Sequence, residues 1–274
     1  MKPHLLTQAA LVRMLYDPSF AQSVRAQPRA VLPELPVALA DELGRIDPRA
    51  LRRDVHRRER TLGELCKELP CATTLAVMEA KSVRVLLDFY ASEHFHAAIT
   101  DGHALVLALG AYLEGVLAEG TLRSPHVAAV LAVELGSARA RRDVARAAPG
   151  KLAREAGVEP LDVPSGTLAT LRVVEQHRFR LALLPAWSVA SDPPALLLPP
   201  LGALQPVCAV SIDGDVSLVE IERPLHAVLV SLPQPRTRNA VLDEATLRLG
   251  GDRAAAEAAL DELLADELVA AFVG

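Results

Sequence analysis

Four side chains that could bind a metal ion lie within ten residues of one another: His94, His96, Asp101 and His103. A structural zinc site needs three or four ligands that converge on one point. Two histidines separated by one residue point the same way only on a strand, whereas the segment SEHFHAAITDGH is typical of a helix end and a turn. We therefore expect a hydrogen-bonded junction here, with His94, His96 and His103 as weak candidate metal ligands.

The other residue types that could do chemistry form no recognisable catalytic pattern. Cys66 and Cys71 are five residues apart, which is not the C-x-x-C spacing of redox or zinc sites, and Cys208 has no partner nearby in the sequence. An odd number of cysteines suits a reducing compartment, and we expect Cys66 and Cys71 to be buried as small hydrophobic side chains. The sequence has no P-loop, G-x-S-x-G or G-x-G-x-x-G motif. We predict no catalytic residue and no cofactor in this chain, which we expect not to be an enzyme.

The most one-sided charged segment is RRDVHRRER at residues 52–60. It lies in a long helix that we predict from Asp47-Pro48 to about Leu69, where Pro70 ends it. One interpretation is a solvated helix face, because Asp54 and Glu59 interrupt the arginines. The alternative is a docking surface for a partner protein, and its residues are Arg49, Arg52, Arg53, Arg57 and Arg60.

Helices should position these side chains throughout residues 1–150. The chain is 51% hydrophobic but only 3% aromatic, so Ala, Leu and Val must supply most of its core. Asp17-Pro18 and Ser124-Pro125 combine a capping residue with a proline that suits the first helical position. We predict further helices near 74–91, 103–118 and 125–147, and hence an all-helical N-terminal domain.

A boundary follows at Pro149-Gly150, where the helical pattern ends. Residues 168–174 and 179–184 are rich in strand-forming side chains and predict a hairpin. Residues 185–206 are rich in proline and predict an irregular segment. We treat residues 151–206 as a connector between two domains.

The last part of the chain predicts a small mixed module at residues 207–274. Strands at 207–212 and 216–221 flank Asp213-Gly214-Asp215, which is a strong hairpin signal. Helices are expected at 223–232, 238–248 and 252–266, and a short strand at 268–273. Hairpin, three helices and closing strand are the components of a winged-helix-like module. The expected fold class is α+β, with an all-helical N-terminal domain followed by this small α/β module.

The distribution of charge argues against nucleic acid as a partner. The net charge is −5, and residues 207–274 hold 5 Lys and Arg against 12 Asp and Glu. The last predicted helix is acidic, and such a helix would repel a DNA duplex. A winged-helix-like module can instead add an extended peptide to the edge of its sheet.

Three segments resemble a known family of bacterial proteins: ALVRMLYDPSFAQSVRAQPRAVLPEL (10–35), IDPRALRRDVHRRERTLGEL (46–65) and LLDFYASEHFHAAI (86–99). They resemble the helical part of the partner proteins of multinuclear non-heme iron-dependent oxidases, which act in the biosynthesis of ribosomal peptide natural products. The tail from about Val207 is similar to the peptide-recognition element, a winged helix like the peptide chaperone of pyrroloquinoline quinone biosynthesis.

The resemblance implies a non-catalytic subunit that forms a heterodimer with an iron oxidase and binds the leader of a precursor peptide. The iron would belong to the oxidase, and this chain would hold no cofactor. The peptide would lie along the second strand of the predicted hairpin and the third helix of the module. The residues implied are Val216, Leu218, Val219, Ile221, Ala255, Ala259 and Leu263.

Two other functions stay open from the sequence. The first is a winged-helix transcriptional regulator with a helical ligand-binding domain, and the second is a metal-dependent enzyme that uses His94, His96 and His103. The N-terminal sequence has no signal-peptide pattern, and no apolar run reaches the length of a membrane span. We therefore expect a cytoplasmic protein that does not bind membranes.

Overall fold

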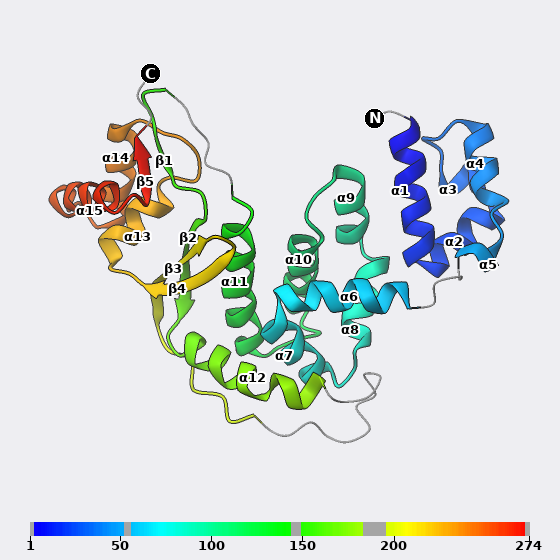
Figure 1. Ribbon diagram of the computed structural model, residues 1–274, viewed down its shortest axis with the longest axis horizontal. Coiled ribbons are helices and arrows are strands. Elements are labelled where there is room, and N and C mark those ends of the chain that lie inside the picture. The colour runs from blue at the N-terminus through cyan, green and yellow to red at the C-terminus, as the bar shows by residue number, and fades with distance from the viewer. Residues whose placement is uncertain (1–2, 52–55, 144–148, 183–195, 272–274) are drawn as a thin grey trace. The chain divides into compact units, whose positions relative to one another are not determined.

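The computed structural model describes residues 3–51, 56–143, 149–182 and 196–271. The chain divides into two compact units (Figure 1). The helical unit comprises Met1–Val127 and Val174–Leu196, and the mixed unit comprises Ala128–Val173 and Leu197–Gly274. The expected connector at 151–206 is therefore divided: residues 151–173 and 197–206 share the mixed unit with the expected module at 207–274, whereas residues 174–196 belong to the helical unit. The described residues form helices and small antiparallel sheets, which is an α+β fold.

Short helices joined by tight turns make up the helical unit. They are α1 (Pro3–Tyr16), α2 (Pro18–Ala26), α3 (Pro28–Val31), α4 (Val37–Gly44), α5 (Pro48–Leu51), α6 (Arg57–Glu68), α7 (Pro70–Ala80), α8 (Arg84–Leu87), η1 (Asp88–Ala91), α9 (Glu93–Asp101) and α10 (Leu105–Ala118). Helices α11 (Pro125–Ala140) and α12 (Thr167–Ala182) each begin in one unit and end in the other.

Proline begins several of these helices, as the sequence predicts. Asp17 caps α2, and its Oδ1 accepts hydrogen bonds from the backbone N–H groups of Ser19 and Phe20, both at 3.0 Å. Pro18 then occupies the first turn, where its missing N–H costs nothing. Helix α11 likewise starts at Pro125, directly after Ser124.

Two predicted helices are shorter than expected. The helix predicted at 74–91 is a series of three helices, because α7 ends at Lys81 in the left-handed conformation (φ 50°) before α8 and η1. The helix predicted at 125–147 ends at Ala140, and residues 144–148 lie outside the described residues. For the long helix predicted at 48–69, the structure has α5 and α6, with residues 52–55 outside the described part.

Aromatic side chains concentrate in the core of the helical unit although they are rare in the chain. Phe89, Tyr90 and Phe95 are fully buried, and the rings of Tyr90 and Phe95 meet edge to face at 5.2 Å. Tyr16 and Tyr112 extend this cluster. The Tyr90 hydroxyl donates to the backbone oxygen of Arg58 at 2.7 Å, and burial raises its pKa. These contacts join α1, η1, α9 and α10.

Besides parts of α11 and α12, the described residues of the mixed unit form two small antiparallel sheets and three further helices. Strand β1 (Leu152–Arg154) pairs with β5 (Val269–Ala271), and β2 (Val158–Pro164), β3 (Leu204–Ile212) and β4 (Asp215–Glu220) form a sheet in that order. The helices are α13 (Arg223–Val230), α14 (Arg238–Arg248) and α15 (Arg253–Ala265). The expected closing strand is therefore present, but it pairs with β1 and not with the hairpin.

The hairpin predicted from 168–174 and 179–184 is wrong, because helix α12 covers this segment up to Ala182, and residues 183–184 lie outside the described part. Thr167 begins it by donating from its hydroxyl to the backbone oxygen of Pro164. Leu168 and Leu171 then pack on the sheet side chains Val163 and Val207. The segment is rich in β-branched and apolar residues, but packing of one helical face against the sheet decides its structure.

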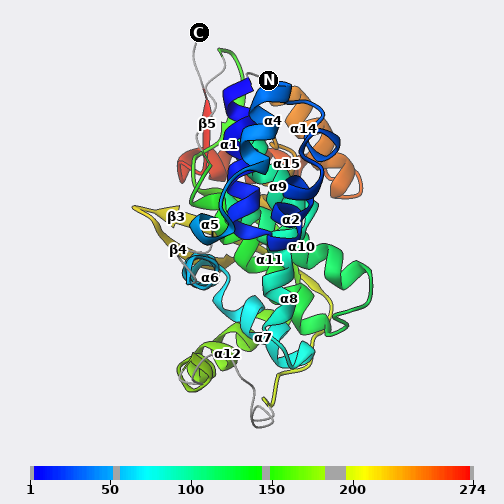
Figure 2. The same ribbon diagram turned by 90° about the vertical axis from the view of Figure 1, so that its right-hand side faces the viewer.

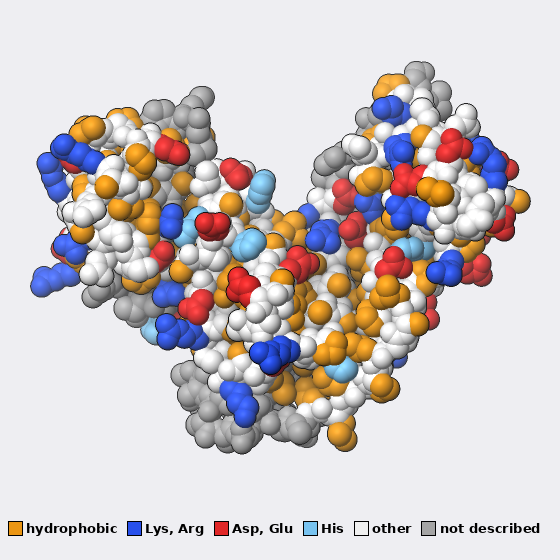
Figure 3. Space-filling view, turned by 180° about the vertical axis from the view of Figure 1, so that it is seen from behind, with side chains coloured by type: hydrophobic (Ala, Val, Ile, Leu, Met, Phe, Trp, Pro, Cys, Tyr) orange, Lys and Arg blue, Asp and Glu red, His pale blue; other side chains and the backbone are white. Residues whose placement is uncertain are grey.

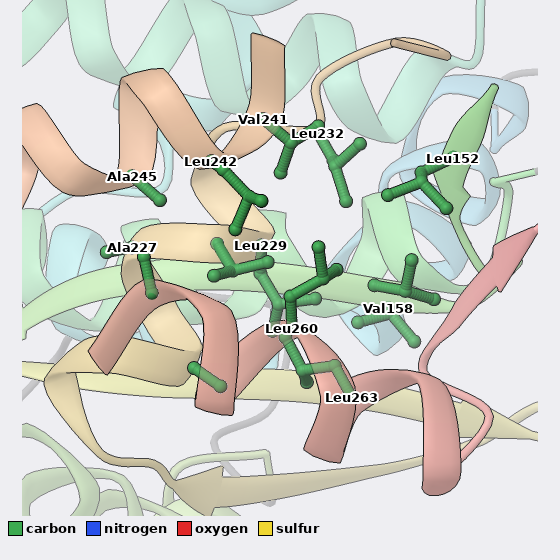
Figure 4. Close-up of a cluster of buried hydrophobic side chains, with 14 of the residues drawn as sticks. Leu152, Val158, Ala227, Leu229, Leu232, Val241, Leu242, Ala245, Leu260 and Leu263 are labelled. Carbon is green, nitrogen blue, oxygen red and sulfur yellow. The ribbon is translucent and has the colours of Figure 1, made fainter. Parts of the chain in front are cut away.

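The hairpin predicted around Asp213-Gly214 is confirmed. Both residues have positive φ (52° and 90°), as a two-residue turn that matches the twist of the strands requires. The three helices predicted after it are also present, within a few residues of the expected bounds. They share one hydrophobic core, in which Leu229, Leu242 and Leu260 point toward one another (Figure 4).

None of the helices in the described part of the chain is long and apolar enough to cross a membrane.

Candidate peptide-binding edge

The sheet β2-β3-β4 has two outer strands, and within the described part of the chain only one of them offers a free row of backbone hydrogen-bonding groups. In an antiparallel sheet, every second residue of an outer strand directs its N–H and C=O away from its neighbour. The backbone N–H of Ser211 in β3 donates to the backbone oxygen of Gly157, so the groups of Gly157 face β3. Along β2, the backbone groups of every second residue from Val158 therefore face outward. Pro160 and Pro164 then fall on the outward positions and have no N–H to offer. Both outward groups of Val158 are already used, by Glu155 O and by the Arg154 guanidinium.

Strand β4 is the open edge. The turn pairs Ile212 with Asp215, so the N–H and C=O groups of Val216, Leu218 and Glu220 point away from β3. Among the described residues, no backbone hydrogen bond joins these three residues to another element. The strand contains no proline and no lysine, which are common means of protecting a sheet edge. An extended peptide can therefore add here as a fourth strand.

The predicted peptide-binding residues of β4 and its end lie on two opposite faces. Val219 faces the same way as Cys208, and Ile221 packs half-buried against the core of α13–α15. Val216 and Leu218 face the other way, where Leu218 packs with Val163 and Val207. Side chains of an added strand would alternate between the same two faces, so Val219 and Ile221 would meet those on the α13–α15 side.

The predicted peptide-binding residues on the third helix, α15, are less accessible to a peptide than those on β4. Ala259 and Leu263 are buried, with 4% and 2% of their surface exposed, and both belong to the core of the mixed unit. Ala255 is half-buried. Leu264, which the sequence analysis did not single out, is half-buried and packs against the same core as Ile221. A peptide could contact Ala255 or Leu264 without repacking the unit, but not Ala259 or Leu263.

The acidic character of α15 is partly balanced by arginines. Arg253 lies 2.8 Å from Asp243 and 3.0 Å from Glu257, and Arg238 lies 2.7 Å from Asp261. Figure 3 shows acidic and basic side chains interleaved over the helical part of this unit, at the upper right. These pairs are exposed and contribute little to stability, but they lower the negative potential that a basic peptide would meet.

The predicted docking arginines are only partly described. Arg49 and Arg60 are exposed and Arg57 is half-buried, whereas Arg52 and Arg53 lie outside the described residues. Near them, His56 contacts Glu59 at 2.9 Å on the exposed start of α6. A docking role for this basic face stays a prediction.

The structure does not bring the candidate metal ligands together. His94 and His96 both lie on α9, where residues two apart point in different directions, and His103 follows the end of that helix. His94 is exposed beside the Tyr112 ring, and His96 is half-buried near Asp17. Within the described ranges, no group of three His, Cys, Asp or Glu side chains is arranged to hold a metal ion.

Cys71 is buried as expected, whereas Cys66 is only half-buried. Cys208 is also buried. Burial raises the pKa of the Cys208 thiol to about 11. A thiol with so high a pKa is protonated at neutral pH and is a poor nucleophile.

Comparison of the sequence with protein-family models and with curated proteins gives no match. The function must therefore be argued from the residues and their geometry.

Proposed function

We propose that this protein is a non-catalytic partner subunit that binds an iron-dependent, peptide-modifying oxidase and recruits the leader of its precursor peptide. The peptide adds as a strand to β4. The open β4 edge is the observation that carries the proposal. Its backbone groups at Val216, Leu218 and Glu220 have no partner among the described residues, and they lie beside the apolar side chain of Val219.

The order of elements supports the same proposal. A three-stranded antiparallel sheet precedes three helices that pack on one of its faces. This arrangement is compatible with the winged-helix-like recognition element that the sequence resembles. In that element, backbone hydrogen bonds supply affinity, and side-chain contacts at alternate positions supply specificity.

The helical unit is the proposed docking part for the oxidase. Its exposed arginines, Arg49 and Arg60, would meet an acidic surface of the enzyme. The iron would be bound by the oxidase, and the present chain would position the peptide.

The first experiment is co-expression of the tagged chain with the oxidase encoded beside its gene, followed by affinity purification and iron analysis of the eluate. Recovery of an iron-loaded enzyme with the chain supports the partner role. If the chain purifies alone and carries stoichiometric metal of its own, the proposal is overturned in favour of a metal enzyme.

Peptide binding is tested with Val216→Pro, which removes an outward N–H and leaves the bonds between β3 and β4 in place. The matched control is Val216→Ala, which shortens the same side chain and keeps the N–H. We expect Val216→Pro to weaken binding of the precursor encoded beside the oxidase by roughly tenfold, and Val216→Ala to change it much less. Equal binding by both variants would exclude strand addition at β4.

A further inference from the structure

A second candidate binding site, independent of the proposed peptide edge, lies in the helical unit. Helices α1, α2 and α9 (Figures 1 and 2) and the turn after α3 enclose a hollow of about 340 Å³. A pocket of this size suits a small ligand. Its walls are mostly apolar, and Leu6, Ala9, Leu32, Leu35 and Ile99 are among them.

Four polar residues also line the hollow: Arg13 from α1, Glu34 from the turn after α3, and His96 and Thr100 from α9. Arg13 lies over the Phe20 ring, with its guanidinium carbon 3.9 Å from the ring centre, which holds the group in place. The Nε of Arg13 and the Nε2 of His96 are both buried, and neither has a hydrogen-bond partner among the described residues. Burying a polar atom without a partner is costly, so two such atoms in the wall of one hollow favour a ligand with polar groups.

The two nitrogen atoms can take opposite hydrogen-bonding roles. Arg13 Nε can only donate. A neutral His96 ring with its proton on Nδ1 offers Nε2 as an acceptor. Burial lowers the pKa of His96, which keeps the ring neutral at physiological pH.

The local charge disfavours an anionic ligand. Asp17 Oδ2 lies 3.9 Å from His96 Nε2, and Glu93 also lies close enough to act on both Arg13 and His96. Glu34 lines the hollow and is exposed. These three carboxylates outweigh the single charge of Arg13, so a carboxylate or phosphate entering the hollow would meet net repulsion.

We propose that this hollow binds a small neutral ligand with a branched apolar group and a carboxamide. The amide oxygen accepts from Arg13 Nε, and the amide N–H donates to His96 Nε2. The apolar group lies against Leu6, Leu32 and Ile99. This pairing satisfies both unpartnered atoms and adds no charge.

The test uses N-acetylleucine amide and N-acetylleucine, which differ only in a neutral amide against a carboxylate. Binding to the full chain is followed by NMR titration near neutral pH. We expect saturable binding of the amide and at least roughly tenfold weaker binding of the acid, which loses the donor to His96 and meets the carboxylates. Equal or tighter binding of the acid, or no saturable binding of either, overturns the proposal.

Three variants locate the site. Arg13→Met keeps an apolar stem but removes the donor, and His96→Leu removes the acceptor; each should weaken amide binding by roughly tenfold. Ala9→Leu fills the hollow from its wall and should abolish binding even if the polar variants fold poorly. The matched control is Arg25→Met, on the exposed side of α2 outside the hollow, which should bind as the wild type does. Amide binding that survives all three changes would show that the hollow is not the site.

Discussion

Cys208 of β3 and Val219 of β4 stand opposite each other in the sheet, yet Cys208 is 1% exposed and Val219 is 48% exposed. The two side chains share the face on which α13–α15 pack. These helices cover the face at Cys208 but leave it exposed at Val219. The open edge of β4 is therefore accompanied by an uncovered apolar side chain, which could contact alternate residues of an added strand.

Substitution of Val219 separates peptide binding from stability. Val219→Ser should weaken binding of the precursor peptide by roughly tenfold, because it removes apolar surface that the peptide would bury. The melting temperature should change little, since the side chain is half exposed in the free protein. Glu220→Gln, on the opposite face of β4, is the control for affinity. A peptide that binds Val219→Ser normally does not lie along this face.

Gly157 directly precedes β2, and because it has no side chain its backbone can lie close to β3. Its φ is +86°, and a Cβ at this position would lie 2.6 Å from the backbone oxygen of Ser211. A backbone atom cannot move aside as the end of a side chain can. We expect Gly157→Ala to lower the free energy of unfolding by about 1–3 kcal/mol, measured by denaturant titration.

Gly63 gives the opposite expectation and serves as the comparison. It lies within helix α6. Apart from its chain neighbours and the backbone of that helix, no atom of the described residues lies within 4 Å of the point that the Cβ of an alanine would occupy. Gly63→Ala should raise the free energy of unfolding by about 0.5–1 kcal/mol, because alanine loses less backbone entropy in a helix. A loss of stability in both variants would mean that helix α6 has a packing requirement at this position.

The sequence predicts the parts of the fold whose signals are local. The Asp213-Gly214 turn and the cap at Asp17 each depend on residue types within a few positions, so the hairpin and α2 could be recognised. The segment at 168–184 could not, because its apolar residues fit a strand or a helix equally well. Its helical state depends on Leu168 and Leu171 meeting Val163 and Val207, and Val207 is distant in sequence.

The same limit applies to the candidate sites. The hairpin signal located β4, but the sequence could not show which face of this strand other elements cover, or that Ala259 and Leu263 are core residues. His96 drew attention as a metal ligand through its spacing from His94. Its actual neighbours are Arg13 and Asp17, which lie far earlier in the chain, and no local pattern predicts that contact.

Two histidines that lie largely inside the protein should make stability depend on pH. Burial lowers the pKa of His96 and of His226. For His96, nearby Arg13 lowers the pKa further and Asp17 opposes the shift. For His226, Arg248 lowers it further and Asp162 opposes the shift. In the unfolded chain both titrate near their ordinary value of 6.5. As the pH falls through 6.5, the unfolded chain takes up protons first. The neutral rings therefore make their full contribution to the free energy of unfolding above pH 6.5. This contribution is lost as the pH falls from 6.5 toward the lowered pKa values of the folded protein.

The measurement is the free energy of unfolding across this pH range for the wild type, His96→Asn, His226→Asn and the double variant. Each single substitution should reduce the fall in stability on acidification, and the double variant should reduce it most. An unchanged pH profile in the double variant would assign the effect to other groups.

The stability of the mixed unit should depend more on the buried Leu260 than on an exposed leucine. Leu260 is fully buried among the side chains of α13, α14 and α15, and Leu229 and Leu242 contact the same core (Figure 4). Leu260→Ala removes buried apolar surface and leaves a cavity, so it should cost about 2–5 kcal/mol in the free energy of unfolding. Leu247→Ala on α14 is the matched control, because Leu247 is 80% exposed and the same change there should cost less than about 0.5 kcal/mol. If the two variants unfold at the same denaturant concentration, α15 does not pack on α13 and α14 as the structure shows, and the sheet face that supports β4 would lack its cover.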